Sequence, residues 1–414
     1  MDSDERRVVA FTAGSHGLVH TYELSIPILL TVWIAEFSTT AAALGLVVTV
    51  GYGLFGVGAL PGGILVDRFG SKPLILACLG GMAGSFLLVS VAPNLLTLAL
   101  AIALWGVTAS VYHPAGLSLL SKAVEQRGTA FGYHGIGGNL GIALGPLATA
   151  LLLLAFDWRV VAAALTLPAA VVAVYGLTVD VESTLPDAGT DAAGGTKGEV
   201  SISTIADDTR ILLAAGFLLV FTFVTFSGLY YRTFLTFLPD LLGDVLGGLV
   251  DVQLVDPESP LADEFDIGRY LYAAVLTVGI AGQYLGGRIA DRMPPERGLV
   301  GVMSVLAMLA LLFVPAGATT ATFIVVSLLL GVALFTVQPL SQATVAAYSP
   351  SEARGLSFGY TYLGIFGVGA LGAALAGTVL TRAGPRELFV VLAAIATLGA
   401  LSALAVTRFA TRQD

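Results

Sequence analysis

Three ionisable side chains share one face of the first apolar segment. His16, His20 and Glu23 are spaced i, i+4 and i+7, so a helix places them on the same side. Histidine changes its charge near neutral pH, and burial can bring a carboxyl group into the same range. We therefore predict that His20 and Glu23 face a polar path and exchange protons. His16 lies nearer the start of the segment, where an interfacial position is an alternative.

The remaining histidines lie later in the same half of the chain. His113 precedes Pro114 in the fourth apolar segment, and His134 lies in the fifth. A proline leaves a backbone carbonyl without its helical donor. His113 or the neighbouring Tyr112 could hydrogen-bond into a path there, unless both only satisfy helix packing.

The segments that carry these residues have the composition of membrane helices. Of the 414 residues, 56% are hydrophobic and only 11% are charged, against roughly 25% charged in soluble domains. Apolar runs of about 20 residues, the length that crosses a bilayer, recur without a polar face. Breaks at charged and turn-forming residues predict twelve spans: 16–36, 41–66, 73–92, 95–121, 129–155, 159–179, 211–238, 268–290, 298–316, 319–347, 355–381 and 387–408.

Charge and cysteine content bound the cellular setting. Most of the 19 Lys and Arg fall on one side of the predicted spans, which places both termini in the cytoplasm and the chain in the cytoplasmic membrane. The first span has no cleavage site, so we expect it to remain. The net charge of -9 comes from acids in 180–208 and 240–266. This pattern suits a halophile, although an acidic loop would explain it too. The single Cys78 excludes an internal disulfide.

The sequence divides into two similar halves. A Gly-, Ser- and Asp-rich stretch at 181–209 reads as a cytoplasmic linker between six-span halves at 1–180 and 210–414. "GGILVDR" at 62–68 returns as "GGRIADR" at 286–292, and "RGTAFGYHGIG" at 127–137 returns as "RGLSFGYTYLG" at 354–364. We predict an all-α membrane protein with two pseudo-symmetric six-helix halves.

Twelve spans in two parallel halves resemble the major facilitator superfamily. The stretch "GGILVDRFGSKP" at 62–73 is similar to that superfamily's loop between spans 2 and 3. The resemblance implies that Asp67 meets the N-terminal end of a helix in the other half and latches the cytoplasmic side. Arg68 and Lys72 would anchor the loop at lipid headgroups, and Asp291 and Arg292 would repeat the role in the second half.

The fifth span resembles the antiporter motif of the same superfamily. It carries Gly132, Gly141, Gly145 and Pro146 in "GYHGIGGNLGIALGP". A glycine-lined, proline-bent helix packs tightly and could seal one pathway while another opens. Ordinary small-residue packing is the alternative. This motif favours export over import.

Further stretches resemble the fosmidomycin-resistance group of drug exporters. They are "HGLVHTYELSIPILL", "VYHPAGLSLLS", "GGNLGIALGP" with Asn139, and "TFLP". Alignment of the halves places Arg232 opposite His20, where it could bind an anionic substrate group or snorkel to the outer headgroups. Gln338 matches His113, and Tyr360 could line the same path.

We therefore predict a secondary transporter that exports small organic molecules by alternating access, coupled to protons, with sodium as the alternative ion. Anion or metabolite uptake and a non-transporting receptor are the alternatives. The chain has no phosphate-binding Gly-x-x-x-x-Gly-Lys loop and no evident nucleophile–base pair, so we expect no enzyme activity. We expect a monomer, no cofactor and no nucleic acid partner. His20, His113 and His134 with Glu23 could in principle hold zinc. We expect no metal, because these spans surround a water-filled path in this fold.

Overall fold

The computed structural model describes residues 1–39, 41–184, 209–210, 212, 216–250, 267–351 and 353–410. All regular secondary structure in these ranges is helical. Most of the predicted linker at 181–209 and most of the second acidic segment, at 251–266, lie outside the described residues.

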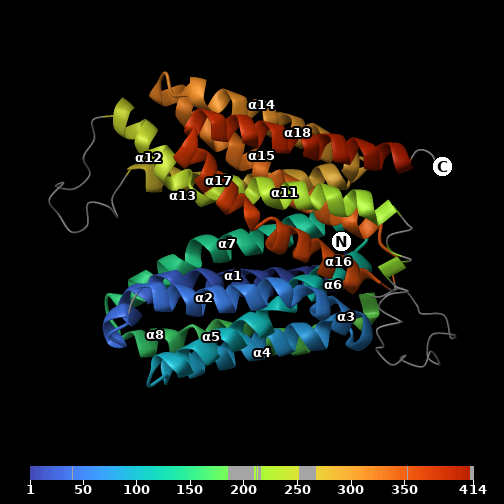
Figure 1. Cartoon of the computed structure of the whole chain (residues 1–414). Helices are drawn as coiled ribbons and strands as arrows, with labels where there is room; N and C mark the ends of the chain where they lie inside the picture. Colours follow the sequence, from blue (N-terminus) through green and yellow to red (C-terminus); the bar gives the residue numbers. More distant parts are fainter. Residues whose placement is uncertain are drawn as a thin grey trace. The chain divides into compact units, whose positions relative to one another are not determined.

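The chain forms two compact units (Figure 1). Unit 1 comprises Met1–Ala215 together with Val345–Leu363, and unit 2 comprises Gly216–Thr344 together with Gly364–Asp414. A segment of the second repeat therefore packs with the first. The sequence-based boundaries at 180 and 210 stay a prediction.

The helices of unit 1 cover the first six predicted spans, some of which are divided into two helices, and one further helix comes from the second repeat. They are α1 (Ser3–Glu36), α2 (Ala41–Val57), α3 (Ala59–Phe69), α4 (Ser71–Ser90), α5 (Leu95–Ser110), α6 (Tyr112–Ala123), α7 (Arg127–Leu153), α8 (Trp158–Ala164), α9 (Thr166–Thr178), the 3₁₀ turn η1 (Glu182–Thr184) and α16 (Arg354–Tyr362).

Unit 2 is built from the rest of the second repeat. Its helices are α11 (Leu218–Thr236), α12 (Leu238–Leu249), α13 (Ile267–Ala290), α14 (Pro295–Ala316), most of α15 (Thr320–Ala347), α17 (Leu371–Arg382) and α18 (Pro385–Ala410). The π-helical turn η4 (Leu363–Val368) follows α16.

The described helices account for the twelve predicted spans. Nine spans in the described residues are long and apolar enough to cross a membrane, and some of these spans consist of two consecutive helices. Helices α2 and α3, which meet at a bend of 43°, form a tenth. Helices α1 and α13 are also long enough, at 34 and 24 residues, but contain more polar side chains. All twelve predicted spans therefore correspond to helices.

The first helix begins earlier than its apolar run. The predicted span starts at 16, whereas α1 starts at Ser3. Asp2 and Glu5 form a capping box at its N-terminus, and the Glu5 carboxylate also accepts the backbone N–H of Glu125 at 2.7 Å. These contacts stabilise a charged first turn that hydropathy alone excludes.

A row of small residues joins α1 to α7, which lie side by side in unit 1 (Figure 1). A Cβ added at Gly137, Gly141 or Gly145 would collide with the backbone of Ala13, Gly17 or Thr21, respectively. Each set has i, i+4, i+8 spacing, so one stripe on each helix makes the contact. Close packing of this kind is how membrane helices associate. The glycines of α7 thus have a packing role, and the sealing role predicted for them stays a prediction.

The fourth span breaks just before its proline. Helix α5 ends at Ser110 and α6 begins at Tyr112, with Val111 between them. The ring of Pro114 cannot donate to the carbonyl four residues earlier, at Ser110, and crowds it. The break turns the side chains of Tyr112 and His113 into the interior of unit 1, where both are buried.

Candidate functional site

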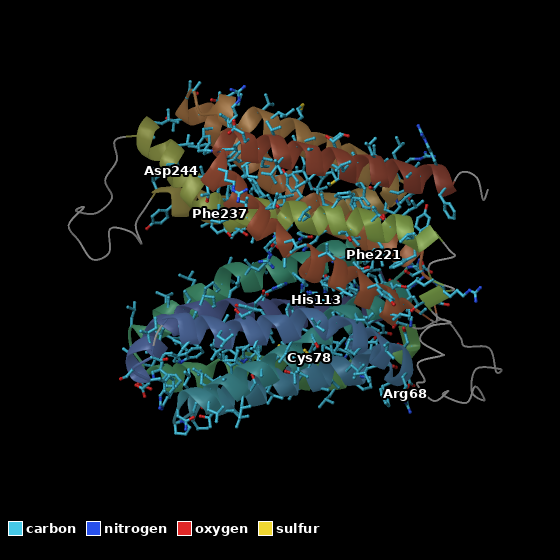
Figure 2. The ribbon with its side chains drawn as sticks, in the orientation of Figure 1. Arg68, Cys78, His113, Phe221, Phe237 and Asp244 are labelled. Carbon is cyan, nitrogen blue, oxygen red and sulfur yellow. The ribbon has the colours of Figure 1, made fainter. Side chains whose placement is uncertain are left out.

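All four histidines of the chain converge in unit 1. His16 and His20 come from α1, His113 from α6 and His134 from α7, and their exposed fractions are 2%, 8%, 2% and 0%. We refer to these four residues as the histidine cluster. The label for His113 marks its place in the ribbon of unit 1 (Figure 2).

The ring of His16 is the centre of this cluster. It stacks on the His134 ring at a centroid distance of 3.9 Å and an interplanar angle of 8°. The centroids of His20 and His113 lie 4.8 Å and 5.2 Å from it. The small-residue row brings α7 close enough for this stacking, because Gly138 lies against the His16 ring and has no side chain to displace it.

Hydrogen bonds fix the orientation of two rings. The Nδ1 of His16 lies 2.8 Å from the backbone oxygen of His134, and the Nδ1 of His20 lies 2.6 Å from the Oε2 of Glu23. The two Nε2 atoms of His16 and His20 face each other at 3.1 Å. A carbonyl oxygen only accepts, so His16 carries its hydrogen on Nδ1. An ionised Glu23 requires the same of His20.

Aromatic side chains enclose the cluster. The hydroxyl of Tyr112 donates to the backbone oxygen of Thr12 on α1. The ring of Tyr362, from α16, stacks on His113 at 4.2 Å. Tyr52 on α2 donates to the backbone oxygen of Glu23 at 2.7 Å. The polar groups thus lie in a site built from α1, α2, α6, α7 and α16.

His16 lies in the interior of α1. The helix starts at Ser3 and His16 is buried, whereas the sequence also allowed an interfacial position near the cytoplasmic end. The i, i+4 spacing of His16 and His20 in the sequence already indicated that both side chains lie on the same face of the helix.

Two other predicted path residues of unit 1 come from α7 and α16. Asn139 on α7 is 6% exposed, and its Nδ2 has no hydrogen-bond partner among the described residues. The hydroxyl of Tyr360 on α16 lies 3.0 Å from the Oγ1 of Thr209.

Unit 2 holds the remaining predicted path residues. Gln338 on α15 accepts a hydrogen bond from the side-chain amide of Gln283 on α13. Arg232 is partly exposed on α11, and its backbone oxygen accepts from Thr236. The two side-chain amides therefore bond each other.

The Asp67 carboxylate binds the start of a helix, as the resemblance implied. Its Oδ1 and Oδ2 accept the backbone N–H groups of Gly355 and Leu356, both at 2.8 Å, in the first turn of α16. Lys122 lies 3.9 Å from the same carboxylate. Gly63 permits the approach, because an added Cβ there would strike the backbone of Gly355. The gating role of Asp67 stays a prediction.

The cations after Asp67 behave differently from each other. Arg68 stacks over Phe69 at 5.2 Å, whereas Lys72 donates to the backbone oxygen of Val179 at 2.6 Å. Lys72 therefore caps the end of α9, where a positive charge is favoured, and its role as a headgroup anchor stays a prediction. Between them Gly70 makes the turn with a φ of 82°. Asp291 and Arg292 are exposed just after α13.

A neighbouring buried arginine was not identified from the sequence as part of this region. Arg354 is 8% exposed, and its Nη1 donates to the backbone oxygen of Ser121 at 2.9 Å. The internal repeat "RGTAF"/"RGLSF" could have drawn attention to Arg354, since it aligns Arg354 with Arg127.

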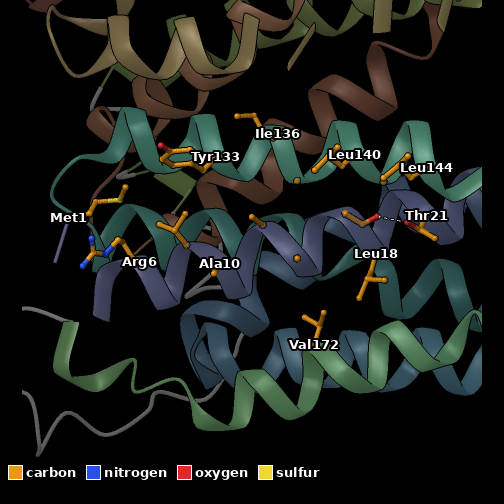
Figure 3. Close-up of a pocket in the computed structure, with 16 residues that line it drawn as sticks. Met1, Arg6, Ala10, Leu18, Thr21, Tyr133, Ile136, Leu140, Leu144 and Val172 are labelled. Atoms are coloured by element: carbon orange, nitrogen blue, oxygen red, sulfur yellow. Dashed lines mark hydrogen bonds between the residues drawn. The ribbon is translucent and has the colours of Figure 1, made fainter. Parts of the chain in front are cut away.

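A groove beside α1 is mainly apolar (Figure 3). It has a volume of about 660 Å³ and runs between α1, α7 and α9. Ala10, Leu18, Leu140, Leu144 and Val172 line it. Helix α1 therefore contributes to both the histidine cluster and the groove, with Arg6 and Thr21 among the residues that line the groove.

Comparison with known proteins identifies relatives over nearly the whole chain. The sequence pattern of the Major Facilitator Superfamily matches residues 13–255 and 255–414. The multidrug resistance protein MdtH of Klebsiella pneumoniae is 26% identical over 351 residues, which cover 82% of this chain and 76% of that protein.

Two further relatives are more similar over a shorter stretch. The puromycin resistance protein pur8 of Streptomyces alboniger is 39% identical over 108 residues, or 25% of this chain and 22% of that protein. An uncharacterized MFS-type transporter of Mycobacterium tuberculosis is 40% identical over 100 residues, 24% of each chain. The chain thus matches about a quarter of the length of these two relatives.

Solved structures share the fold. The human organic anion transporter MFSD10 (TETRAN) has a TM-score of 0.66 and 19% identity, with 97% of this chain and 100% of that chain covered. The proton:xylose symporter XylE, bound to 6-bromo-6-deoxy-D-glucose, has a TM-score of 0.72 and 14% identity, with coverages of 96% and 95%. At these identities the likeness concerns the fold alone.

Proposed function

Because the chain belongs to the major facilitator superfamily, we propose that it exports small organic molecules across the cytoplasmic membrane by alternating access, in exchange for protons. The observation that carries this proposal is the pair of hydrogen bonds from Gly355 and Leu356 to Asp67. These bonds join the first repeat to the second at the end of a membrane helix, where a path would open and close.

The chemistry of this contact suits a reversible latch. An anionic acceptor at a helix N-terminus gains from the exposed N–H groups and from the helix dipole. The bonds are made with backbone N–H groups that water can also satisfy, so the contact can break without leaving an unpaired polar group in lipid. A closed state is therefore stabilised without being permanent.

The substrate path in this proposal includes polar residues of both repeats. They are His20, Glu23, Tyr112, His113, His134, Asn139, Arg232, Gln338 and Tyr360. Ionisable and amide groups within membrane helices are costly unless they face a cavity or a partner. The gating residues are Asp67, Arg68, Lys72, Gly132, Gly141, Gly145, Pro146, Asp291 and Arg292.

Export of drug-like compounds is supported by the names of two relatives. One is a multidrug resistance protein and the other a puromycin resistance protein. Resistance by a membrane carrier requires movement out of the cytoplasm. Both termini are proposed to lie on the cytoplasmic side, and the chain to act as a monomer.

Transport by the purified chain in liposomes tests this function. Vesicles are loaded with a pH-sensitive dye and exposed to a panel of compounds that includes puromycin, with and without an imposed pH gradient. We expect compounds to enter the vesicles through those protein molecules whose cytoplasmic side faces outward. This uptake should depend on the imposed pH gradient and should be accompanied by proton movement in the opposite direction. A sodium gradient is the control for the coupling ion. Flux in the opposite direction, or no flux for any compound, would contradict export.

A further inference from the structure

We propose that the histidine cluster binds one divalent transition-metal ion, of the zinc, cobalt or nickel class. The ligands are the Nε2 atoms of His16 and His20 and a ring nitrogen of His113. One ligand atom from each of these three residues lies within 4.8 Å of the others. The proposal concerns binding and does not depend on which compounds the protein exports.

The hydrogen-bonding pattern of two rings calls for a cation between them. His16 donates from Nδ1 to the His134 backbone oxygen, and with an ionised Glu23 the Nδ1 of His20 donates to that carboxylate. A neutral imidazole with its hydrogen on Nδ1 has a lone pair on Nε2. Two such lone pairs then face each other at 3.1 Å in a buried site. This arrangement is unfavourable unless a metal ion or an added proton lies between the two nitrogens.

The distances favour a shared metal ion. Two imidazole nitrogens that bind one tetrahedral ion at 2.0–2.1 Å lie about 3.3 Å apart. The Nε2 atoms of His16 and His20 are already at 3.1 Å. The longest separation in the set is 4.8 Å, so closure around an ion needs no more than about 1.5 Å of movement by any ligand atom.

The groups that hydrogen-bond the other ring nitrogen of each proposed ligand are those typical of a metal site. A histidine that binds a metal usually donates its other ring N–H to a carboxylate or a backbone carbonyl, which fixes its orientation. His20 donates to the carboxylate of Glu23 and His16 donates to a carbonyl. Both kinds of supporting group are therefore present, one for each of the two closest ligands.

Charge and ligand type limit the choice of ion. Neutral imidazoles suit zinc, cobalt, nickel and copper, whereas magnesium and calcium prefer oxygen. Glu23 supplies one nearby negative charge. Three protein ligands leave a fourth position for water, a substrate donor or His134, whose two ring nitrogens have no hydrogen-bond partner among the described residues.

This inference replaces an expectation from the sequence. No metal was expected because the histidines were placed beside a water-filled path. Each ring of the cluster is at most 8% exposed, and the proposal departs from that expectation on the strength of this burial and of the ring geometry. His16, which the zinc-like set from the sequence omitted, becomes the central ligand.

Cobalt binding to the purified full-length chain tests the site. The protein is prepared in detergent without a polyhistidine tag and titrated with Co²⁺. We expect visible absorption bands of Co²⁺ in a four- or five-coordinate nitrogen site, saturating at one ion per chain and displaced by Zn²⁺. No transport is measured, so failure of this proposal is distinguishable from failure of the proposed function.

Variants assign the ligands. His20→Ala and His113→Ala should each lose the bands while the helical circular dichroism and the elution volume stay those of the wild type. Glu23→Gln should keep one site per chain but weaken Co²⁺ binding by about 10- to 100-fold, as loss of a group behind a ligand does. Arg297→Gln, at an exposed arginine of α14 that leaves every histidine in place, is the control and should bind like the wild type.

Two results would overturn the proposal. One is the absence of saturable bands in a folded wild-type protein, which would mean that an added proton lies between His16 and His20. The other is unchanged binding in both His20→Ala and His113→Ala, which would place the bound ion elsewhere.

Discussion

The carboxylate of Asp67 accepts the backbone N–H of Gly355 at 2.8 Å, although 288 residues separate them in the sequence. The adjacent N–H of Leu356 binds the other oxygen of the same carboxylate at 2.8 Å. A glycine pair makes this possible, because Gly63 and Gly355 let the two helices approach at the backbone. The contact links residues that the internal repeat assigns to different halves.

We predict that Asp67→Asn leaves the protein folded and inserted but lowers its turnover. The amide keeps one acceptor and loses the charge, and hydrogen bonds to charged groups contribute about 1.5–3 kcal/mol. A change of that size shifts the population of the latched state by roughly 10- to 100-fold. Flux in proteoliposomes, normalised to inserted protein, measures the effect. Asp291→Asn should do less, since Asp291 is exposed after α13. Normal flux in Asp67→Asn would remove the latch.

Gly141→Ala should destabilise unit 1. Its new methyl group would meet the backbone of Gly17, which cannot move as a side chain can. Overpacking of this kind costs typically 1–3 kcal/mol. The midpoint of thermal unfolding in detergent should fall by several degrees. Gly84→Ala on α4 is the matched control, because an added Cβ there meets nothing within 4 Å. Equal midpoints for the two variants would contradict the packing role.

Arg354→Gln should also lower thermal stability. The buried guanidinium donates to Ser121 at 2.9 Å, and its removal leaves that carbonyl without this donor. The expected loss is about 1–3 kcal/mol, with partial recovery in Arg354→Lys. Arg297→Gln, at an exposed arginine of α14, serves as the comparison and should be neutral. Wild-type stability in Arg354→Gln would show that this contact contributes little.

Arg232→Gln should weaken the binding of anionic compounds selectively. The guanidinium can form charge-assisted, bidentate hydrogen bonds that are roughly twice as strong as neutral ones. Neutral and cationic compounds should bind as before or better, as measured by competition in proteoliposomes. An equal loss for all compounds would indicate a structural role, and no loss for any would indicate that Arg232 extends to the outer headgroups.

The sequence by itself determined the class of the protein and the main elements of its fold. Apolar run length is a local property, so it located twelve membrane helices whatever their packing. The repeated glycine–acid motif identified Asp67, because the end of a helix is encoded within a few residues. Helical spacing also placed His20 and Glu23 on one face, and the structure bonds them at 2.6 Å.

Only the tertiary structure decided which faces meet. Convergence of His16, His113 and His134 depends on the rotation of three helices about their axes, and spacing within one helix does not fix that rotation. Here the fit of Gly137, Gly141 and Gly145 against α1 fixes how α7 faces α1, and the packing of α6 adds His113. The early start of α1 has a similar cause, since Glu5 is held by the distant backbone of Glu125. Contacts between residues far apart in the chain therefore turned four separate histidines into one site.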